Sequence, residues 1–136
     1  MHHVFYLDGN AKKVSWIIQT GNSTAEQSRE HVEIYNDKIS NLQSKYIALH
    51  IGLFWGIGVF IIKNHDHIKI KLDDKEMFEQ IEDNSKIKDE FIKNKIKFIN
   101  QLISQRKLKV DFEDMQQENN PAKKTLDAKE LKTKND

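Results

Sequence analysis

The segment VFYLDGN (residues 4–10) decides the fold, and IKIKLDD (residues 68–74) repeats its pattern later in the chain. Each is an apolar or alternating run of the kind that forms a β-strand, and each ends in aspartate. The two aspartates are Asp8 and Asp73. Carboxylates are the ligands that Mg²⁺ prefers in proteins, so the pattern indicates a scaffold that holds divalent metal ions against a nucleic-acid phosphate.

Composition indicates one folded domain over residues 1–136, with a core from about residue 4 to residue 131 and a frayed end. The chain is 38% hydrophobic and 32% charged, with two Trp and a formal net charge of +1. It has no cysteine, which excludes disulfides and thiolate metal sites and favours a reducing compartment. The first residues lack the pattern of a secretory signal, so we expect a cytoplasmic protein.

Periodicity and turn signals predict the order β-β-β-α-β-α-α-β-α. The predicted strands are residues 4–7, 14–20, 31–35, 68–72 and 107–112. The predicted helices are one that opens at Ser40-Asn41 and includes residues 46–62, one at 75–81, one capped by Ser85, and one from Pro121 to about Leu131. This order predicts an α/β fold with a five-stranded mixed sheet and helices on both faces.

Residues 46–62 are almost entirely apolar and permit two interpretations. Their length lies at the short end for a membrane-spanning helix, and Gly52 and Gly56 have the spacing of packed membrane helices. A central helix that is covered on both sides explains the same residues, and His50 within the run favours it. We therefore expect no membrane partner, a hydrogen-bonded His50 in the core, and packed side chains for Phe54 and Trp16.

Four motifs in this order resemble those of the ribonuclease H family, over nearly the whole chain. They are Asp8-Gly9 after the first strand, SNLQSKYIA (residues 40–48) opening the central helix, LDDKE (residues 72–76) after the fourth strand, and NNPAK (residues 119–123) starting the last helix. The resemblance implies the fold already predicted and a function: hydrolysis of the RNA strand of an RNA/DNA hybrid by two metal ions held by four carboxylates.

The resemblance assigns only two of those four carboxylates. Asp8 takes the first position and Asp73 the third, whereas Lys45 stands at the second, normally Glu, and Lys123 at the fourth, normally Asp. The histidine that often precedes the last helix has no counterpart in residues 114–118. A charged lysine has three donors and no acceptor, so it cannot ligate a metal ion.

These replacements predict a remnant site in which Asp8 and Asp73 bind metal weakly or not at all. Asp74, Asp114 and Glu118 are left as candidates to replace one missing ligand, but no acid adjoins Lys45. We expect no cofactor, or Mg²⁺ or Mn²⁺ if the site is active.

A basic segment offers a surface for nucleic acid. Residues 85–109 carry eight basic and two acidic side chains, a formal excess of +6 within a nearly neutral chain. The candidate nucleic-acid-binding residues are Lys86, Lys93, Lys97, Arg106 and Lys107. The alternative is the solvated face of an amphipathic helix. His65-Asp66-His67 has a zinc-like spacing but lacks a third ligand, so we interpret it as a polar loop.

Three functions remain open. The first is a ribonuclease H-like protein that has lost two-metal cleavage and acts as a binding or accessory module for an RNA/DNA hybrid or another duplex. The second is an active metal-dependent ribonuclease H with an altered metal site. The third is a protein-interaction module or homo-oligomer that uses the apolar helix and an exposed sheet edge.

Overall fold

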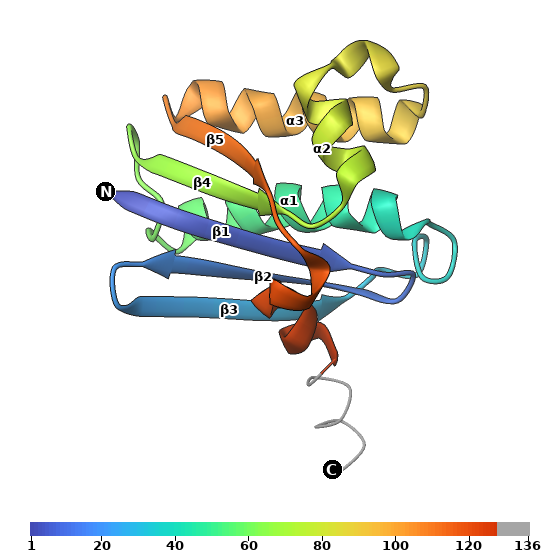
Figure 1. Ribbon diagram of the computed structural model, residues 1–136, viewed down its shortest axis with the longest axis horizontal. Helices are drawn as coiled ribbons and strands as arrows, with labels where there is room; N and C mark the ends of the chain where they lie inside the picture. Colours follow the sequence, from blue (N-terminus) through green and yellow to red (C-terminus); the bar gives the residue numbers. More distant parts are fainter. Residues whose placement is uncertain (128–136) are drawn as a thin grey trace.

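A five-stranded mixed sheet with helices on both faces forms the molecule, as the sequence predicts (Figure 1). The structure is a computed structural model and describes residues 1–127. The strands are β1 (His2–Gly9), β2 (Lys13–Thr20), β3 (Ser23–Glu30), β4 (His67–Leu72) and β5 (Lys109–Asp114). The helices are α1 (Asn41–Gly58), α2 (Lys75–Glu82) and α3 (Glu90–Gln105), with short 3₁₀ turns at Asn84–Lys86 and Gln117–Asn119 and a last helical segment over residues 121–127.

The strand order is β3-β2-β1-β4-β5. The first three strands form an antiparallel meander, and β4 and β5 add in parallel beyond β1. Because β1 and β4 are parallel neighbours, their carboxyl ends meet at one edge of the sheet. The fold therefore brings the residues that follow these two strands close together, which positions the candidate site.

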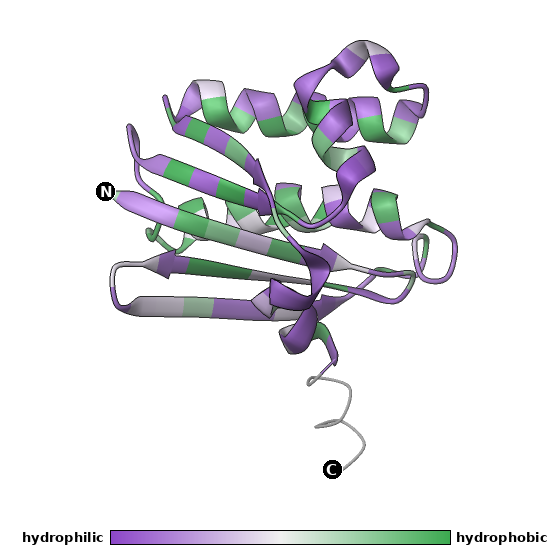
Figure 2. Ribbon diagram, in the orientation of Figure 1, coloured by the Kyte–Doolittle hydropathy of each residue, from purple (hydrophilic) through white to green (hydrophobic). Residues whose placement is uncertain are grey.

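The third strand differs from the prediction. Residues 31–35 were expected to be a strand, but β3 is Ser23–Glu30 and follows β2 through a turn in which Gly21 has a φ of +57°. Among residues 1–127 this strand is an edge with no partner on its outer side. Backbone pairing with β2 holds it, and its polar side chains give no apolar pattern. Figure 2 shows this contrast between a largely hydrophilic β3 and hydrophobic central strands.

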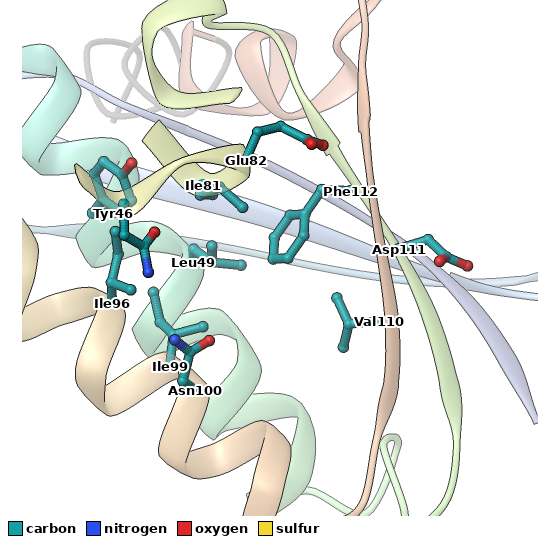
Figure 3. A pocket seen from close by; sticks show the side chains of 11 residues that line it. Tyr46, Leu49, Ile81, Glu82, Ile96, Ile99, Asn100, Val110, Asp111 and Phe112 are labelled. Carbon is teal, nitrogen blue, oxygen red and sulfur yellow. The ribbon is translucent and has the colours of Figure 1, made fainter. Parts of the chain in front are cut away.

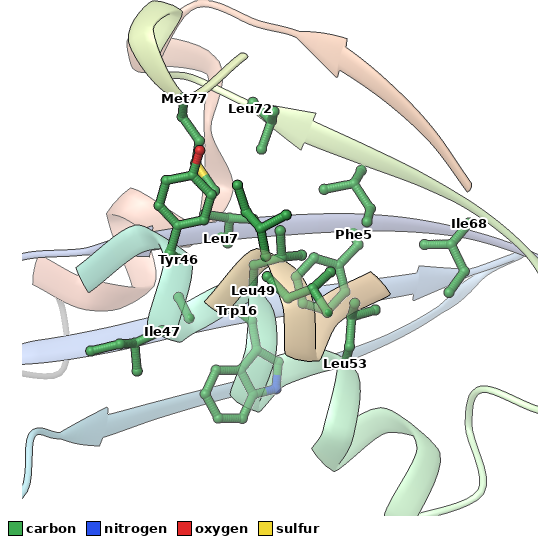
Figure 4. Packing of buried hydrophobic residues seen from close by; sticks show 14 of the residues in the cluster. Phe5, Leu7, Trp16, Tyr46, Ile47, Leu49, Leu53, Ile68, Leu72 and Met77 are labelled. Carbon is green, nitrogen blue, oxygen red and sulfur yellow. The ribbon is translucent and has the colours of Figure 1, made fainter. Parts of the chain in front are cut away.

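The core lies between the sheet and α1, where Phe5, Leu7 and Trp16 meet Leu49 and Leu53 (Figure 4). Trp16 is buried, as predicted. Within residues 1–127, no helix has both the length and the hydropathy needed to cross a bilayer.

Helix starts follow local capping chemistry. Ser40 and Gln43 form a capping box at the start of α1. Asp89 rather than Ser85 caps α3; Ser85 instead donates its hydroxyl to Asp83 in the preceding 3₁₀ turn. The last helix starts as predicted, with Asn120 accepting from the Ala122 amide and Pro121 at the first helical position. Its expected end near residue 131 lies outside the described residues.

Two glycines of α1 provide a direct test of this packing. A Cβ at Gly52 would lie 2.5 Å from Phe5 Cζ and 2.9 Å from Trp16 Cγ, whereas at Gly58 it would meet nothing within 4 Å. We expect Gly52→Ala to lower the free energy of unfolding by about 1–3 kcal/mol through overpacking. Gly58→Ala is the matched control and should be neutral, or stabilising by up to about 1 kcal/mol. Urea denaturation of both variants measures the difference; equal stabilities would contradict the close approach of α1 to the sheet.

Candidate functional site

Three carboxylates gather around one ammonium group where β1 and β4 end. The Lys45 Nζ atom, from the first turns of α1, lies 3.2 Å from Asp73 Oδ1, 3.5 Å from Asp74 Oδ2 and 4.0 Å from Asp8 Oδ1. Only 9% of the Lys45 side chain is exposed, so little water separates these charges. The fold thus unites Asp8 and Asp73, as expected, but with a lysine between them.

The electrostatics of this cluster follow from burial and proximity. Burial raises the pKa of Asp8, the neighbouring Asp73 carboxylate raises it further, and the Gly9 amide, Lys45 and Lys123 act in the opposite direction. Burial alone would lower the pKa of Lys45, but Asp73, Asp74 and Asp8 outweigh burial, and the net effect raises that pKa. Lys45 is therefore a permanent cation in this position and has no role as a base at neutral pH.

Asn120 is a further neighbour of Asp73 that the sequence alone did not identify. This side chain is buried, and its Nδ2 donates to the Leu7 carbonyl at 2.8 Å and to Asp73 Oδ2 at 2.9 Å. The same residue caps the last helix through its Oδ1. The Asn-Pro pair signalled a helix cap, but only the tertiary structure reveals that the amide also satisfies the second oxygen of Asp73.

Lys123 lies in the first turn of the last helix, is exposed, and acts to lower the pKa of Asp8 electrostatically. It therefore adds a second positive charge that acts on Asp8. The two lysines that replace expected acids both act on the same carboxylate.

The residues present do not fit a two-metal centre. An ammonium has no lone pair for a metal ion, and it takes the place between Asp8 and Asp73 that a cation would need. Among residues 1–127, no group of three or more histidine or acidic side chains is placed to hold a metal ion. Of the three candidate replacements, Asp74 lies against the Lys45 ammonium at 3.5 Å, while Asp114 and Glu118 line a cavity of about 640 Å³ together with Asp73.

Comparisons with known proteins agree on the architecture. No protein-family model and no curated protein matches the chain. Solved structures do: RNase H1 from the halophilic archaeon Halobacterium salinarum superimposes with a TM-score of 0.72 at 17% identity, over 90% of this chain and 91% of that one. The chain has the ribonuclease H fold.

Two further structures support this assignment. The N-terminal RNase H domain of a Mycobacterium tuberculosis protein gives a TM-score of 0.69 at 18% identity, over 90% of this chain and 92% of that one. LC11-RNase H1, in complex with an RNA/DNA hybrid, gives 0.67 at 20% identity, over 87% and 88% of the two chains. At such identities the ribonuclease H fold is what the chain shares.

Close packing fixes this end of the ribonuclease H fold. A Cβ at Gly9 would lie 2.8 Å from the Ser44 carbonyl carbon, so only glycine lets β1 pass this close to α1. The buried His31 ring bridges the Ser44 hydroxyl at 2.8 Å and the Asn10 carbonyl at 3.1 Å. These contacts hold the end of β1, which carries Asp8, against the first turns of α1, which carry Lys45.

The five candidate nucleic-acid-binding residues lie apart from this cluster. They are all exposed, along the 3₁₀ turn before α3, on α3 itself and directly after it: Lys86, Lys93, Lys97, Arg106 and Lys107. Lys93 also contacts Glu90 at 3.4 Å. The ribonuclease H fold thus presents a basic row on its outer helix and an acidic cluster at the end of its sheet.

The His65-Asp66-His67 segment has a structural role. Asp66 accepts from the buried His3 at 2.7 Å and from the Lys63 amide at 2.8 Å, while His67 pairs with Asp111 at 2.7 Å. Despite its burial, the His3 and Lys63 hydrogen bonds lower the pKa of Asp66 to about 2. The motif closes the loop before β4, in line with the polar-loop interpretation.

A cavity of about 400 Å³ lies between α1, α2, α3 and β5 (Figure 3). Its lining combines apolar side chains such as Leu49 and Phe112 with polar ones such as Asn100, and the hydroxyl of Tyr46 donates to Gln80 Oε1 at 2.8 Å. Burial raises the pKa of Tyr46, which keeps the hydroxyl protonated. Asp111 points away from the cavity in Figure 3.

Removal of the central cation tests the electrostatic account of the cluster. We expect Lys45→Met to lower the free energy of unfolding by about 3 kcal/mol at neutral pH, because it leaves the buried carboxylates uncompensated. Lys71→Met, which breaks the more exposed pair with Glu113, is the matched control and should cost much less. Chemical denaturation across pH measures both.

The pH dependence has a defined sign. The loss caused by Lys45→Met should shrink as the pH falls through the pKa of Asp8, which lies above 3.8, because neutral carboxylates need no cation. It should also shrink at high pH, as wild-type Lys45 loses its proton above its ordinary pKa of 10.5. A loss that is constant across pH would contradict an electrostatic role.

Proposed function

We propose that this protein binds an RNA/DNA hybrid, or a duplex of similar shape, without cleaving it. The observation that carries the proposal is the Lys45 ammonium 3.2 Å from Asp73 and 4.0 Å from Asp8. In the ribonuclease H reaction those carboxylates would hold metal ions. With Lys45 charged between them, they have an internal counterion instead.

The absence of cleavage follows from the chemistry of the replacement. A lysine neutralises negative charge as a metal ion does, but it supplies neither a Lewis acid for the phosphate nor a metal-bound water as nucleophile. Asn120 occupies the second oxygen of Asp73, so that carboxylate has both oxygens engaged. A metal ion that binds Asp73 would have to compete with the Lys45 ammonium for this carboxylate.

Binding is supported by the fold and by surface charge. LC11-RNase H1, which shares the fold, was solved with a hybrid bound. In this chain the row from Lys86 to Lys107 is exposed along and around α3, where phosphates of a duplex can contact it without entering the cavity beside Asp73. That cavity is lined by four acids and one lysine, so its negative charge would repel a phosphate: Asp73, Glu79, Asp114 and Glu118, with Lys75.

A binding and cleavage assay on one labelled substrate tests the proposal. We expect a hybrid to bind at low salt with an affinity that falls steeply as salt rises, because counterions are released from the phosphates. Lys97→Glu/Lys107→Glu should weaken binding about tenfold or more, whereas Lys12→Glu, at an exposed lysine in the turn between β1 and β2 that pairs with Asp37, should change it little. Fluorescence anisotropy measures both.

The same reactions with Mn²⁺ decide whether cutting occurs. The proposal predicts intact RNA in the wild type, at the level of an Asp8→Ala control. Cleavage above that control would establish the active-enzyme alternative, and an absence of hybrid binding at low salt would remove the binding function.

Restoration of the expected acids should restore metal binding. In Lys45→Glu/Lys123→Asp, four carboxylates face one another, so we expect a lower thermal unfolding temperature without metal and a rise when Mn²⁺ is added. The wild type should show no such rise. Differential scanning fluorimetry with and without Mn²⁺ measures it, and an equal response of both proteins would contradict the role assigned to Lys45.

A further inference from the structure

The solvent side of α1 departs from the prediction. Phe54 was expected to be packed but is 64% exposed. His50 was expected to be hydrogen-bonded, but its ring stacks on Phe98, and its buried Nδ1 atom has no hydrogen-bond partner among residues 1–127. Both expectations are wrong, because α1 is apolar on more sides than the sheet beneath it can cover.

The chain turns sharply after α1 and closes a cavity against the sheet. Phe60 adopts a φ of +66°, and the Ile61 amide donates to the Gly56 carbonyl at 3.0 Å. The turn brings Phe60 and Ile61 beside Ile18 and Thr20 of β2, and these residues line a cavity of about 300 Å³. The cavity therefore lies near the start of β1 and the end of β2, whereas Asp8 lies near the end of β1.

A buried histidine connects Thr20 to a carboxylate. In the antiparallel register of β1 and β2, His3 lies opposite Thr20, on the same side of the sheet as the pair Phe5 and Ile18. The His3 Nδ1 atom lies 2.7 Å from Thr20 Oγ1, and its Nε2 atom lies 2.7 Å from Asp66 Oδ2. The His3 side chain is fully buried, whereas Thr20 is partly exposed. A hydroxyl, an imidazole and a carboxylate thus stand in series, with the hydroxyl-bearing residue at the cavity.

The ionisation of Asp66 determines which ring nitrogen of His3 carries the proton. Burial acts to raise the pKa of Asp66, but hydrogen bonds from His3 and the Lys63 amide, with the Met1 amino group at 3.2 Å, lower it to about 2. An ionised carboxylate only accepts, so Nε2 of the neutral ring carries the proton and donates to Asp66. Nδ1 is then free to accept from the Thr20 hydroxyl, which is the position of a general base.

We propose that Thr20 is the nucleophile of a site that hydrolyses small carboxylic esters, with His3 as general base and Asp66 as the positioning residue behind it. These roles are those of a serine–histidine–aspartate triad with threonine as the nucleophile. The cavity indicates the substrate class. Phe60 and other apolar side chains fit a short acyl chain, and Lys63 supplies positive charge that favours an oxyanion.

The proposed reaction consumes one ester and one water. Thr20 Oγ1 bonds to the ester carbonyl carbon while its proton passes to His3 Nδ1, and the Asp66 carboxylate stabilises the imidazolium through Nε2. Collapse of the tetrahedral intermediate breaks the bond to the alcohol oxygen, which takes the proton from Nδ1. Water then attacks the acyl-threonine and gives one proton to Nδ1. That proton returns to Thr20 as the carboxylic acid leaves.

Hydrolysis of p-nitrophenyl butyrate by the full chain is the first test. We expect a burst of about one nitrophenolate per chain and then slower release, because the acyl-threonine forms before it is hydrolysed. Thr20→Val keeps the shape of the side chain without its hydroxyl and should lower the burst rate at least about tenfold, whereas Thr20→Ser should retain it. Thr24→Val, at another residue that lines the cavity, is the matched control and should change the rate little.

Peptide mapping of the acid-quenched wild type locates the acyl group without any variant. The butyryl group should be on Thr20. An adduct on a lysine or on another hydroxyl overturns the proposal. So does release no faster than in buffer, or a burst that Thr20→Val leaves unchanged while thermal unfolding shows that the variant is folded.

Asp66→Asn tests the series behind the nucleophile. The substitution keeps an oxygen that can accept from His3 and the Lys63 amide, but it removes the charge that stabilises the imidazolium. The burst rate should fall about tenfold or more. The acidic limb of its pH–rate profile should move to lower pH, because the ring is harder to protonate without the carboxylate. A slower burst with an unmoved limb would contradict the role of Asp66. Hybrid binding along α3 uses none of these residues, so the two proposals fail independently.

Discussion

The Lys45 ammonium is the constraint on which this end of the molecule depends. It joins α1 to the carboxyl ends of β1 and β4 through Asp8, Asp73 and Asp74. Burial of charge costs free energy, and an ion cluster of this kind is retained only when its geometry and hydrogen bonds are nearly complete. Asn120 completes it by donating to the remaining oxygen of Asp73. The cluster therefore fixes the relation of helix to sheet as much as it defines a site.

The same cluster accounts for how much of the site the sequence predicted. Asp8 and Asp73 were identifiable because each ends an apolar run, and parallel strands bring such ends together. Lys45 was identifiable because it stands in a motif that resembles ribonuclease H. The hydrogen bond from Asn120 to Asp73 was not identifiable from the sequence. An asparagine before a proline looks the same whether it only caps a helix or also donates to a carboxylate that is distant in the sequence.

The fold was predictable for a related physical reason, and its errors have common causes. Buried strands and helices carry periodic apolar residues, so the sheet and three of its helices could be located. The strand β3 carries no such pattern because it is an edge, and residues 31–35 imitate one by alternation. Phe54 was placed in the core because apolarity was equated with burial, although a helix with two apolar faces can bury only one of them within its own chain.

An internal cation changes what a ribonuclease H fold requires. Four carboxylates that face one another need divalent ions to relieve their repulsion, so stability and chemistry depend on the same metal. Here Lys45 supplies a positive charge that is covalently part of the chain, unlike a bound metal ion. The pKa of Lys45 is raised by the acids that it neutralises. In the function we propose, the fold no longer depends on metal at this point. In that function the exposed basic side chains along and after α3, rather than the carboxylates at the ends of the strands, contact the nucleic acid.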